Sequence, residues 1–217
     1  MSSATWRLYV ILDPSAAGGR DLAEVAREAI RGGADVLQLR EKTSSDKAVA
    51  AMARRVLALA RPAGIPLIIN DRVQVAKAVG ADGVHVGQED WPVARAREVL
   101  GPGRLIGKST HSLAQAMAAE AEGADYIGFG PLFATSTKPN APAIGTAAIG
   151  AAAARVQVPI VCIGGIEPGT LDEALHAGAR CVAVVRAVCA APDPEAAARE
   201  LKARMRQFDR ANSARHL

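Results

Sequence analysis

The feature that most constrains the fold of this chain is a regular alternation of short β-branched segments with alanine-rich segments of helical period. "PLIIN" (66–70) is typical of the first kind, and "LAEVAREAIRGG" (22–33) is typical of the second. Alternating strands and helices require a parallel sheet with right-handed crossovers, because parallel neighbours cannot be joined by a tight turn. The predicted strands are 7–13, 36–40, 66–70, 83–87, 104–109, 126–130, 159–165 and 181–187, and the predicted helices are 21–31, 46–61, 73–79, 92–100, 112–122, 146–155, 169–177 and 194–208.

A weak internal repeat favours one way of building this sheet. The triplet Gly-Ala-Asp, replaced by Gly-Ala-Arg in the last copy, joins a predicted helix to the second, fourth, sixth and eighth strands, at 33–35, 80–82, 123–125 and 178–180. Glycine fits a left-handed helix C-cap there. A joint that recurs at every even strand suits a closed barrel better than an open sheet with a reversal point. We therefore predict an α/β fold, a single (β/α)8 TIM barrel with a parallel eight-stranded core; a doubly wound sheet is the alternative.

The length and composition indicate one domain. The chain has 217 residues, half of them hydrophobic, and contains nothing that resembles a linker. We place the barrel at 7–207, preceded by an N-terminal extension (1–6) and followed by a tail (208–217) that we expect to be disordered. Since about 250 residues are typical of this barrel, its loops must be short.

Charge and cysteine usage exclude several classes of protein. The net charge is +4, but the cations are interleaved with acidic residues and aromatics make up only 3% of the chain, so we expect no nucleic-acid partner. Cys162, Cys181 and Cys189 form no CxxC pair and are interpreted as buried thiols of a reducing compartment. No apolar run has the length of a membrane span. These features predict a cytoplasmic protein, and a homo-oligomer is compatible with them.

One predicted strand carries an unusual polar face. In "VLQLREK" (36–42), Gln38, Arg40 and Lys42 alternate with Leu37, Leu39 and Glu41. Because strand side chains alternate, the leucines can pack against helices while Gln38 and Arg40 point into the barrel and Lys42 stands over its mouth. Active sites of such barrels lie at the C-terminal ends of the strands. This face therefore predicts an anion-binding site at the mouth.

The ends of the next strands extend this site. Asn70 and Asp71 follow the third strand, Asp90 follows the fourth, and Ser109 ends the fifth. Mg²⁺ is usually held by one or two carboxylates while substrate phosphates complete its shell, so Asp71 and Asp90 are candidate ligands. The alternative for each residue is a surface ion-pair network. His85, inside the fourth strand, is interpreted as a hydrogen-bonded core residue.

A second anion site is predicted over the last strands, where barrels often bind phosphate through backbone amides. Gly164 and Gly165 would let the backbone approach an anion, and Arg186 would supply charge. A tight turn explains the two glycines equally well. The long loop after the sixth strand is a candidate lid between the two sites, and its polar residues are Thr135, Ser136, Thr137 and Lys138.

An ordered set of motifs resembles the thiamine phosphate synthase family over about residues 7–207. The motifs are "QLREK" (38–42), "IIND" (68–71), "DGVHVGQED" (82–90), "GKSTHS" (107–112), "ADYIGFGPLFATSTK" (124–138), "IGGI" (163–166) and "VAVVRA" (182–187). The resemblance implies a transferase that joins a pyrimidine methyl diphosphate to a thiazole phosphate, carboxylated or not. The products are thiamine phosphate and pyrophosphate.

The resemblance also implies roles for individual residues. Gln38, Arg40, Lys42, Asn70, Ser109 and Lys138 would contact the pyrimidine diphosphate, and Arg40, Lys42, Ser109 and Lys138 among them would be catalytic. Asp71 and Asp90 would hold the Mg²⁺ cofactor. Thr135, Thr137, Gly165, Val185 and Arg186 would receive the thiazole phosphate. Leu39, Glu41 and Ser136, inside the matching motifs, are assigned to substrate binding as well.

The family mechanism implied by this resemblance is dissociative: the bond to the diphosphate breaks first, and the thiazole nitrogen captures the pyrimidine methyl cation. One departure is Arg186, where many members have serine; it would strengthen the phosphate site or narrow it. Two alternatives are a thiazole phosphate tautomerase-like isomerase, which generally has a less complete diphosphate-binding set, and a non-catalytic phosphate-ligand-binding barrel.

Overall fold

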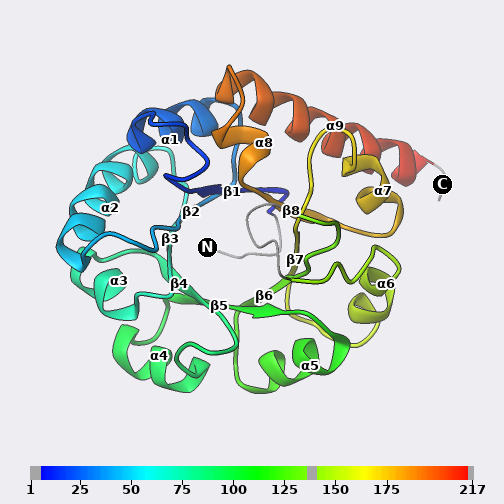
Figure 1. Ribbon diagram of the computed structural model, residues 1–217. Coiled ribbons are helices and arrows are strands. Elements are labelled where there is room, and N and C mark those ends of the chain that lie inside the picture. The colour runs from blue at the N-terminus through cyan, green and yellow to red at the C-terminus, as the bar shows by residue number, and fades with distance from the viewer. Residues whose placement is uncertain (1–5, 136–140, 215–217) are drawn as a thin grey trace.

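Eight parallel strands close into a barrel in the order in which they occur in the chain (Figure 1). The computed structural model describes residues 6–135 and 141–214. The strands are β1 (Leu8–Leu12), β2 (Val36–Leu39), β3 (Leu67–Asn70), β4 (Gly83–Val86), β5 (Leu105–Thr110), β6 (Tyr126–Phe129), β7 (Ile160–Ile163) and β8 (Cys181–Val184). The barrel is closed by the pairing of β8 with β1. The predicted (β/α)8 TIM barrel is thus confirmed.

A ring of helices surrounds the barrel (Figure 1). The helices are α1 (Leu22–Arg31), α2 (Asp46–Ala60), α3 (Val73–Val79), α4 (Val93–Leu100), α5 (Leu113–Ala121), α6 (Ala148–Ala153), α7 (Leu171–His176), α8 (Arg186–Cys189) and α9 (Pro194–Ala214). The prediction of a strand through 187 was wrong, since β8 ends at Val184 and α8 begins at Arg186. The run "CVAVV" that precedes Arg186 is apolar throughout, and such a run cannot by its period distinguish a strand from a buried helical turn.

The prediction of a disordered tail from residue 208 was also wrong, because α9 continues to Ala214. Phe208 packs edge-on against the His176 ring of α7, with 4.9 Å between ring centroids. Asp209 accepts a 2.7 Å hydrogen bond from Nε of Arg7, next to β1. These two contacts anchor the last turns of the helix to the barrel. None of the helices in the described part of the chain is both long and apolar enough to cross a bilayer.

The Gly-Ala-Asp repeat has a structural role that its sequence did not reveal. Each aspartate precedes an even strand and accepts a hydrogen bond from a backbone N–H at the start of the preceding odd strand. Asp35 accepts from Leu8 at 2.9 Å, Asp82 from Leu67 at 2.9 Å, and Asp125 from Ile106 at 2.6 Å. The glycines of the repeat have positive φ, as the predicted left-handed caps require. The repeat therefore fixes neighbouring strands at the N-terminal end of the barrel.

The side chains of the barrel divide into two cores. Leu37 and Leu39 face outward and are buried between strands and helices. Tyr9, Tyr126 and Trp6 belong to a smaller cluster in the interior. The Trp6 ring packs edge-on against both tyrosines, with centroids 6.1 and 5.5 Å away. Since Trp6 precedes β1, this packing fills the N-terminal end of the barrel.

Candidate active site

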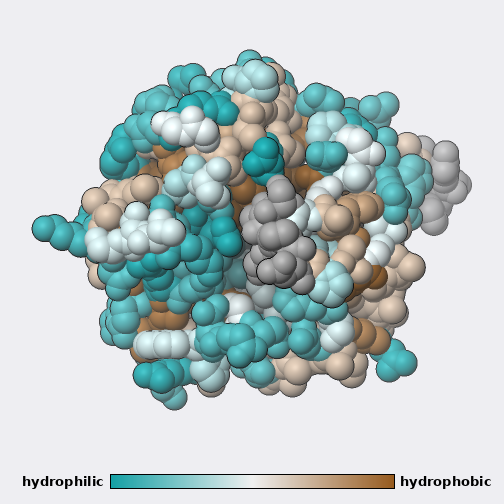
Figure 2. Space-filling view, in the orientation of Figure 1, coloured by the Kyte–Doolittle hydropathy of each residue, from teal (hydrophilic) through white to brown (hydrophobic). Residues whose placement is uncertain are grey.

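A cavity of ≈ 450 Å³ lies at the C-terminal ends of the strands, where the sequence placed the site. Figure 2 looks onto this end: hydrophilic residues gather beside the mouth over β2–β4, and less polar residues lie on the opposite side, over β7. Nine of the predicted site residues line the cavity. They are Gln38, Arg40, Asn70, Ser109, Thr135, Gly164, Gly165, Val185 and Arg186.

Arg40 is held at the mouth by a carboxylate from the neighbouring strand. It forms an ion pair with Asp13, which follows β1 and whose side chain is 3% exposed. Asp13 also accepts hydrogen bonds from the backbone N–H and the hydroxyl of Ser15, at 2.9 and 2.6 Å. Because Asp13 is fixed by Ser15, the guanidinium of Arg40 has a defined position before any ligand binds.

Asp71 and Asp90 lie side by side, because their carboxyl groups share a hydrogen bond. Asp71 has φ = 58°, a left-handed conformation that is uncommon outside glycine, and its N–H donates to the His85 carbonyl at 2.8 Å. Its carboxylate forms an ion pair with Lys42. Asp90 accepts from the N–H of Gly87 at 2.7 Å. The backbone around both residues is thus arranged to bring two carboxyl groups together.

The two carboxyl groups have opposite pKa shifts. Burial, and then the hydrogen bond with Asp90, raise the pKa of Asp71, although Lys42 opposes them. For Asp90, burial alone would raise the pKa. The hydrogen bonds from Asp71 and from the Gly87 N–H, together with the charges of Lys42 and Lys108, outweigh burial and lower the pKa. Two ionised carboxyl groups this close repel each other, and a cation between them relieves that repulsion.

The pair fits a Mg²⁺ ion better than a metal held by protein alone. The described residues include no group of three or more histidine, cysteine, aspartate or glutamate side chains able to hold a metal. Mg²⁺ needs only one or two protein carboxylates when substrate phosphates and water complete its octahedron. Asp71 and Asp90 are two such carboxylates, and Asp71 directly follows Asn70, which lines the cavity.

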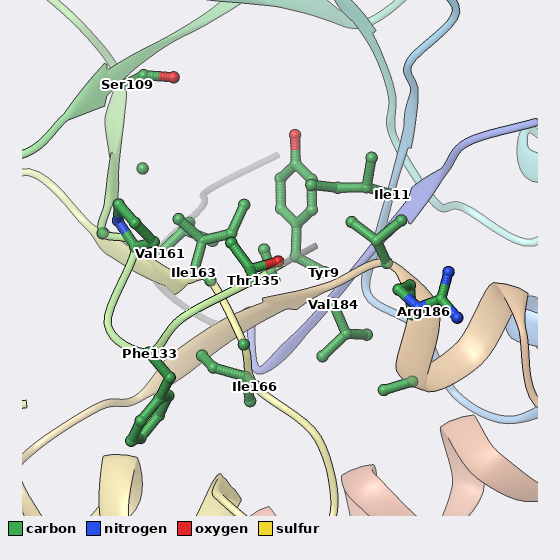
Figure 3. A pocket seen from close by; sticks show the side chains of 18 of the residues that line it. Tyr9, Ile11, Ser109, Phe133, Thr135, Val161, Ile163, Ile166, Val184 and Arg186 are labelled. Carbon is green, nitrogen blue, oxygen red and sulfur yellow. The ribbon is translucent and has the colours of Figure 1, made fainter. Parts of the chain in front are cut away.

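A chain of hydrogen bonds crosses the barrel beneath the mouth. The Gln38 amide donates to the Tyr9 hydroxyl at 2.7 Å, and the hydroxyls of Tyr9 and Tyr126 are 3.0 Å apart. Nδ1 of His85 lies 3.2 Å from the Tyr126 hydroxyl, and Nε2 lies 2.9 Å from Oγ of Ser109. Figure 3 shows the Tyr9 and Ser109 hydroxyls at the cavity. Gln38 and Ser109 are therefore the two ends of one network.

The opposite side of the cavity is built from loops and the start of α8. Gly165 has φ = 64°, and a Cβ there would lie 2.6 Å from the Ala134 carbonyl oxygen and 2.7 Å from Cβ of Phe133. The glycine is therefore required for close packing of the two loops, whether or not an anion binds. Within the described residues its N–H has no acceptor. Arg186 begins α8 and is exposed, and its side chain makes no hydrogen bond or ion pair with the described part of the chain.

Comparisons with known proteins agree with the sequence motifs. A family model described as thiamine monophosphate synthase matches residues 8–188. The chain belongs to this family. A thiamine-phosphate synthase of Chloroflexus aurantiacus is 51% identical over 91% of this chain and 92% of its own, and one of Shouchella clausii is 47% identical over 93% and 97%. The solved structure of a thiamine phosphate pyrophosphorylase from Pyrococcus furiosus has a TM-score of 0.86 at 35% identity, covering 94% of this chain and 97% of that one.

Membership of the thiamine monophosphate synthase family makes this chain a transferase that condenses a pyrimidine with a thiazole moiety. The match favours this activity over the isomerase and over the non-catalytic barrel. It extends over nearly the whole barrel, and so includes both sides of the cavity.

Several predicted synthase residues lie away from the cavity. The Leu39 side chain is fully buried between the barrel and the helices. Glu41 folds back on its own loop, accepting from the N–H and hydroxyl of Thr43 at 2.6 and 2.8 Å and from the N–H of Ser44 at 3.0 Å. These hydrogen bonds lower the pKa of Glu41, and the one from the Thr43 N–H has the largest effect, although burial opposes them.

The predicted residues Ser136, Thr137 and Lys138 lie outside the described residues.

The residues that sequence reasoning missed are Tyr9, Tyr126 and Asp13. The chain contains only two tyrosines, and both point into the barrel. Aromatic residues are rare in this chain, so two tyrosines at inward-facing positions of predicted strands could have been recognised as candidates for the site. Asp13 gave none, because nothing in the sequence relates it to Arg40.

Proposed function

We propose that the synthase couples a pyrimidine methyl diphosphate to a thiazole phosphate by a dissociative route. The observation that carries the proposal is the division of one cavity into two unlike sides. Arg40, Lys42 and two carboxylates gather on the side formed by β2–β5, whereas loop backbone and Arg186 form the side over β7 and β8. A diphosphate with Mg²⁺ suits the first side, and a phosphate monoester suits the second.

Asp71 and Asp90 would hold the Mg²⁺ ion. The ion, when bound, would neutralise charge on the diphosphate. The fit rests on the proximity of the two carboxyl groups, which are hydrogen-bonded to each other, since a divalent cation can satisfy both at once. Lys42, now paired with Asp71, lies close enough to this site to reach the same diphosphate.

Arg40, Lys42 and Ser109 would stabilise the leaving diphosphate, and so would Lys138, which the family motif assigns to the same role. In the first step the bond between the methylene carbon and the diphosphate oxygen breaks, and its electron pair stays on that oxygen. Preorganised donors that meet this growing negative charge lower the barrier without having to reorganise. The fixed position of Arg40 against Asp13 is such a preorganised donor.

The thiazole nitrogen then donates its lone pair to the methylene carbon. No general base is needed, because the nitrogen carries no proton to remove. The cation would react with water in an open site, and the cavity wall between the two sides is apolar. This wall includes Ile11, Val161 and Ile163 (Figure 3). The enzyme's remaining task is to hold the nucleophile close to the cation.

The thiazole phosphate would be received by Thr135, Thr137, the N–H of Gly165, and Val185 and Arg186 at the start of α8. Arg186 is exposed beside the cavity and can turn toward a phosphate without breaking an ion pair. We therefore prefer a strengthening role for this arginine over a narrowing one. We also propose that the enzyme works in the cytoplasm, where its three free, buried thiols would remain reduced.

The test is pyrophosphate release by purified protein given both substrates and Mg²⁺, with each component omitted in turn. Release that requires all three, with thiamine phosphate formed in equal amount, is the expected result. Pyrophosphate release without the thiazole phosphate would instead indicate hydrolysis of the diphosphate, and the coupling mechanism would be wrong.

A further inference from the structure

The hydrogen-bond network beneath the mouth has a direction that follows from counting its hydrogens. Tyr9 and Tyr126 are 1% and 0% exposed, so their hydroxyls must find partners within the protein. In the described part of the chain, the Tyr9 hydroxyl has two partners, Gln38 and Tyr126. The Tyr126 hydroxyl also has two, Tyr9 and His85. Each hydroxyl has one hydrogen to donate.

The direction is fixed at Gln38. Its amide nitrogen can only donate, so the Tyr9 oxygen accepts there and its hydrogen goes to the remaining partner, Tyr126. The Tyr126 hydrogen must then go to Nδ1 of His85. Because Nδ1 accepts, the ring hydrogen of a neutral imidazole lies on Nε2, which faces Oγ of Ser109. Every donor in the network therefore points from Gln38 toward Ser109.

The barrel is shaped to hold the imidazole in this place. A Cβ on Gly107 would lie 2.4 Å from Nδ1 of His85 and 2.2 Å from Cζ of Tyr126, and a Cβ on Gly128 would lie 3.1 Å from Cε1 of His85. The neighbouring strands β5 and β6 thus each have a glycine where a larger side chain would collide with the His85 ring. The rings of His85 and Tyr126 are tilted by 34°, with 5.5 Å between their centroids. Packing therefore orients the ring independently of its hydrogen bonds.

We infer that His85 is a positioning residue for Ser109: its Nε2–H donates to the Ser109 oxygen and so leaves the hydroxyl hydrogen to point into the cavity. Ser109 Oγ has no other partner in the described part of the chain, and the residue lines the cavity. In this state the hydroxyl can donate to the leaving oxygen of the diphosphate. The opposite tautomer would make Ser109 the donor to His85, with no hydrogen left for the substrate. The role of the hydroxyl rests on the function proposed above.

The tautomer can be measured without substrate. Long-range ¹H–¹⁵N NMR of the full chain, labelled at its four histidines, distinguishes Nε2–H from Nδ1–H rings. The His85 signal, assigned by its loss in His85→Gln, should show the hydrogen on Nε2. In Tyr126→Phe, which keeps the ring volume and removes the donor to Nδ1, the signal should move toward the other tautomer. Hydrogen on Nδ1 in the unaltered protein would overturn the inference.

The consequence for catalysis can be measured with a double-mutant cycle. We expect His85→Phe to lower kcat about 10- to 100-fold with little change in KM, since one donor to a developing anion is weakened. His85→Gln, whose amide can still donate to Ser109, should recover most of this loss. In a Ser109→Ala background, His85→Phe should have no further effect. His176→Phe, on the outer surface, is the matched control and should leave kcat unchanged.

The outcomes separate this inference from the proposed function. Additive losses from His85→Phe and Ser109→Ala would show that His85 acts independently of Ser109, and the positioning role would be wrong. If the unaltered protein releases no pyrophosphate, the proposed function fails, and the NMR result then decides the direction of the network alone. If His85→Phe does not fold, Tyr126→Phe tests the same donor chain through kcat and the tautomer.

Discussion

The two sides of the cavity differ in how much of their geometry is set before a ligand binds. On the β2–β5 side, Arg40 and Lys42 already have carboxylate partners, Asp13 and Asp71. On the side over β7 and β8, Arg186 has no partner in the described part of the chain. The first side resembles a preorganised catalytic site, and the second a binding site that a ligand completes. Substitutions on the first side should therefore change kcat, and those on the second mainly KM.

The largest effect is expected at the carboxylate pair. Asp71→Asn should lower Mg²⁺-dependent turnover about 100-fold or more, because one of the two proposed Mg²⁺ ligands loses its charge. Asparagine tolerates the left-handed backbone at this position, so the melting temperature should change little. Turnover would be followed over a Mg²⁺ titration. Unchanged activity at low Mg²⁺ would show that Asp71 does not hold the ion. It would also weaken the contrast between a catalytic side over β2–β5 and a binding side over β7 and β8.

The next effect tests the preset geometry of Arg40. Asp13→Asn should lower kcat/KM for the pyrimidine diphosphate about tenfold, since a charge-assisted hydrogen bond of about 1.5 kcal/mol no longer fixes the guanidinium. Steady-state kinetics with the thiazole phosphate saturating would measure it. If Asp13 only neutralised Arg40, its removal would instead tighten diphosphate binding. Ser15→Ala, which removes one of the donors to Asp13, should show a smaller loss in the same direction.

On the opposite side, Arg186→Ser should raise KM for the thiazole phosphate about tenfold and leave kcat nearly unchanged, because an exposed phosphate contact of about 1.5 kcal/mol is lost. KM for the pyrimidine diphosphate serves as the internal control. A lower KM for the thiazole phosphate would mean that Arg186 narrows the site. A fall in kcat alone would show that both sides are catalytic.

The sequence predicted the preorganised side better than the other. Gln38, Arg40 and Lys42 follow from the alternation of a single strand, and Asp71 and Asp90 from neighbouring strand ends. The contact of Tyr9 with Tyr126 could not be predicted in this way, because β1 and β6 are not paired and meet only across the barrel. Such contacts depend on closure of the whole barrel.

Two predictions of secondary structure from the sequence were also wrong, because in each case the composition of the segment fitted more than one structure. The start of α8 was interpreted as strand because "CVAVVRA" suits either, and the end of α9 was interpreted as a tail because "FDRANSARHL" is polar. In the second case an aromatic contact and an ion pair hold the end of the helix against other elements. Neither partner, His176 nor Arg7, is near in sequence. Both of these helix ends therefore needed the tertiary structure.

The smallest effect on activity is expected at Glu41, which lies inside the "QLREK" motif but caps its own loop. Glu41→Gln should leave kcat and both KM values unchanged and lower the free energy of unfolding at pH 7 by about 1–2 kcal/mol. Because folding lowers the pKa of Glu41, this stabilisation is present above the unfolded pKa of about 4.3 and is lost as pH falls through the folded pKa. Urea unfolding should therefore show a larger difference between the two proteins at pH 7 than at pH 3. Glu98→Gln, at an exposed position of α4, is the matched control. A raised KM for either substrate would place Glu41 in the binding site after all.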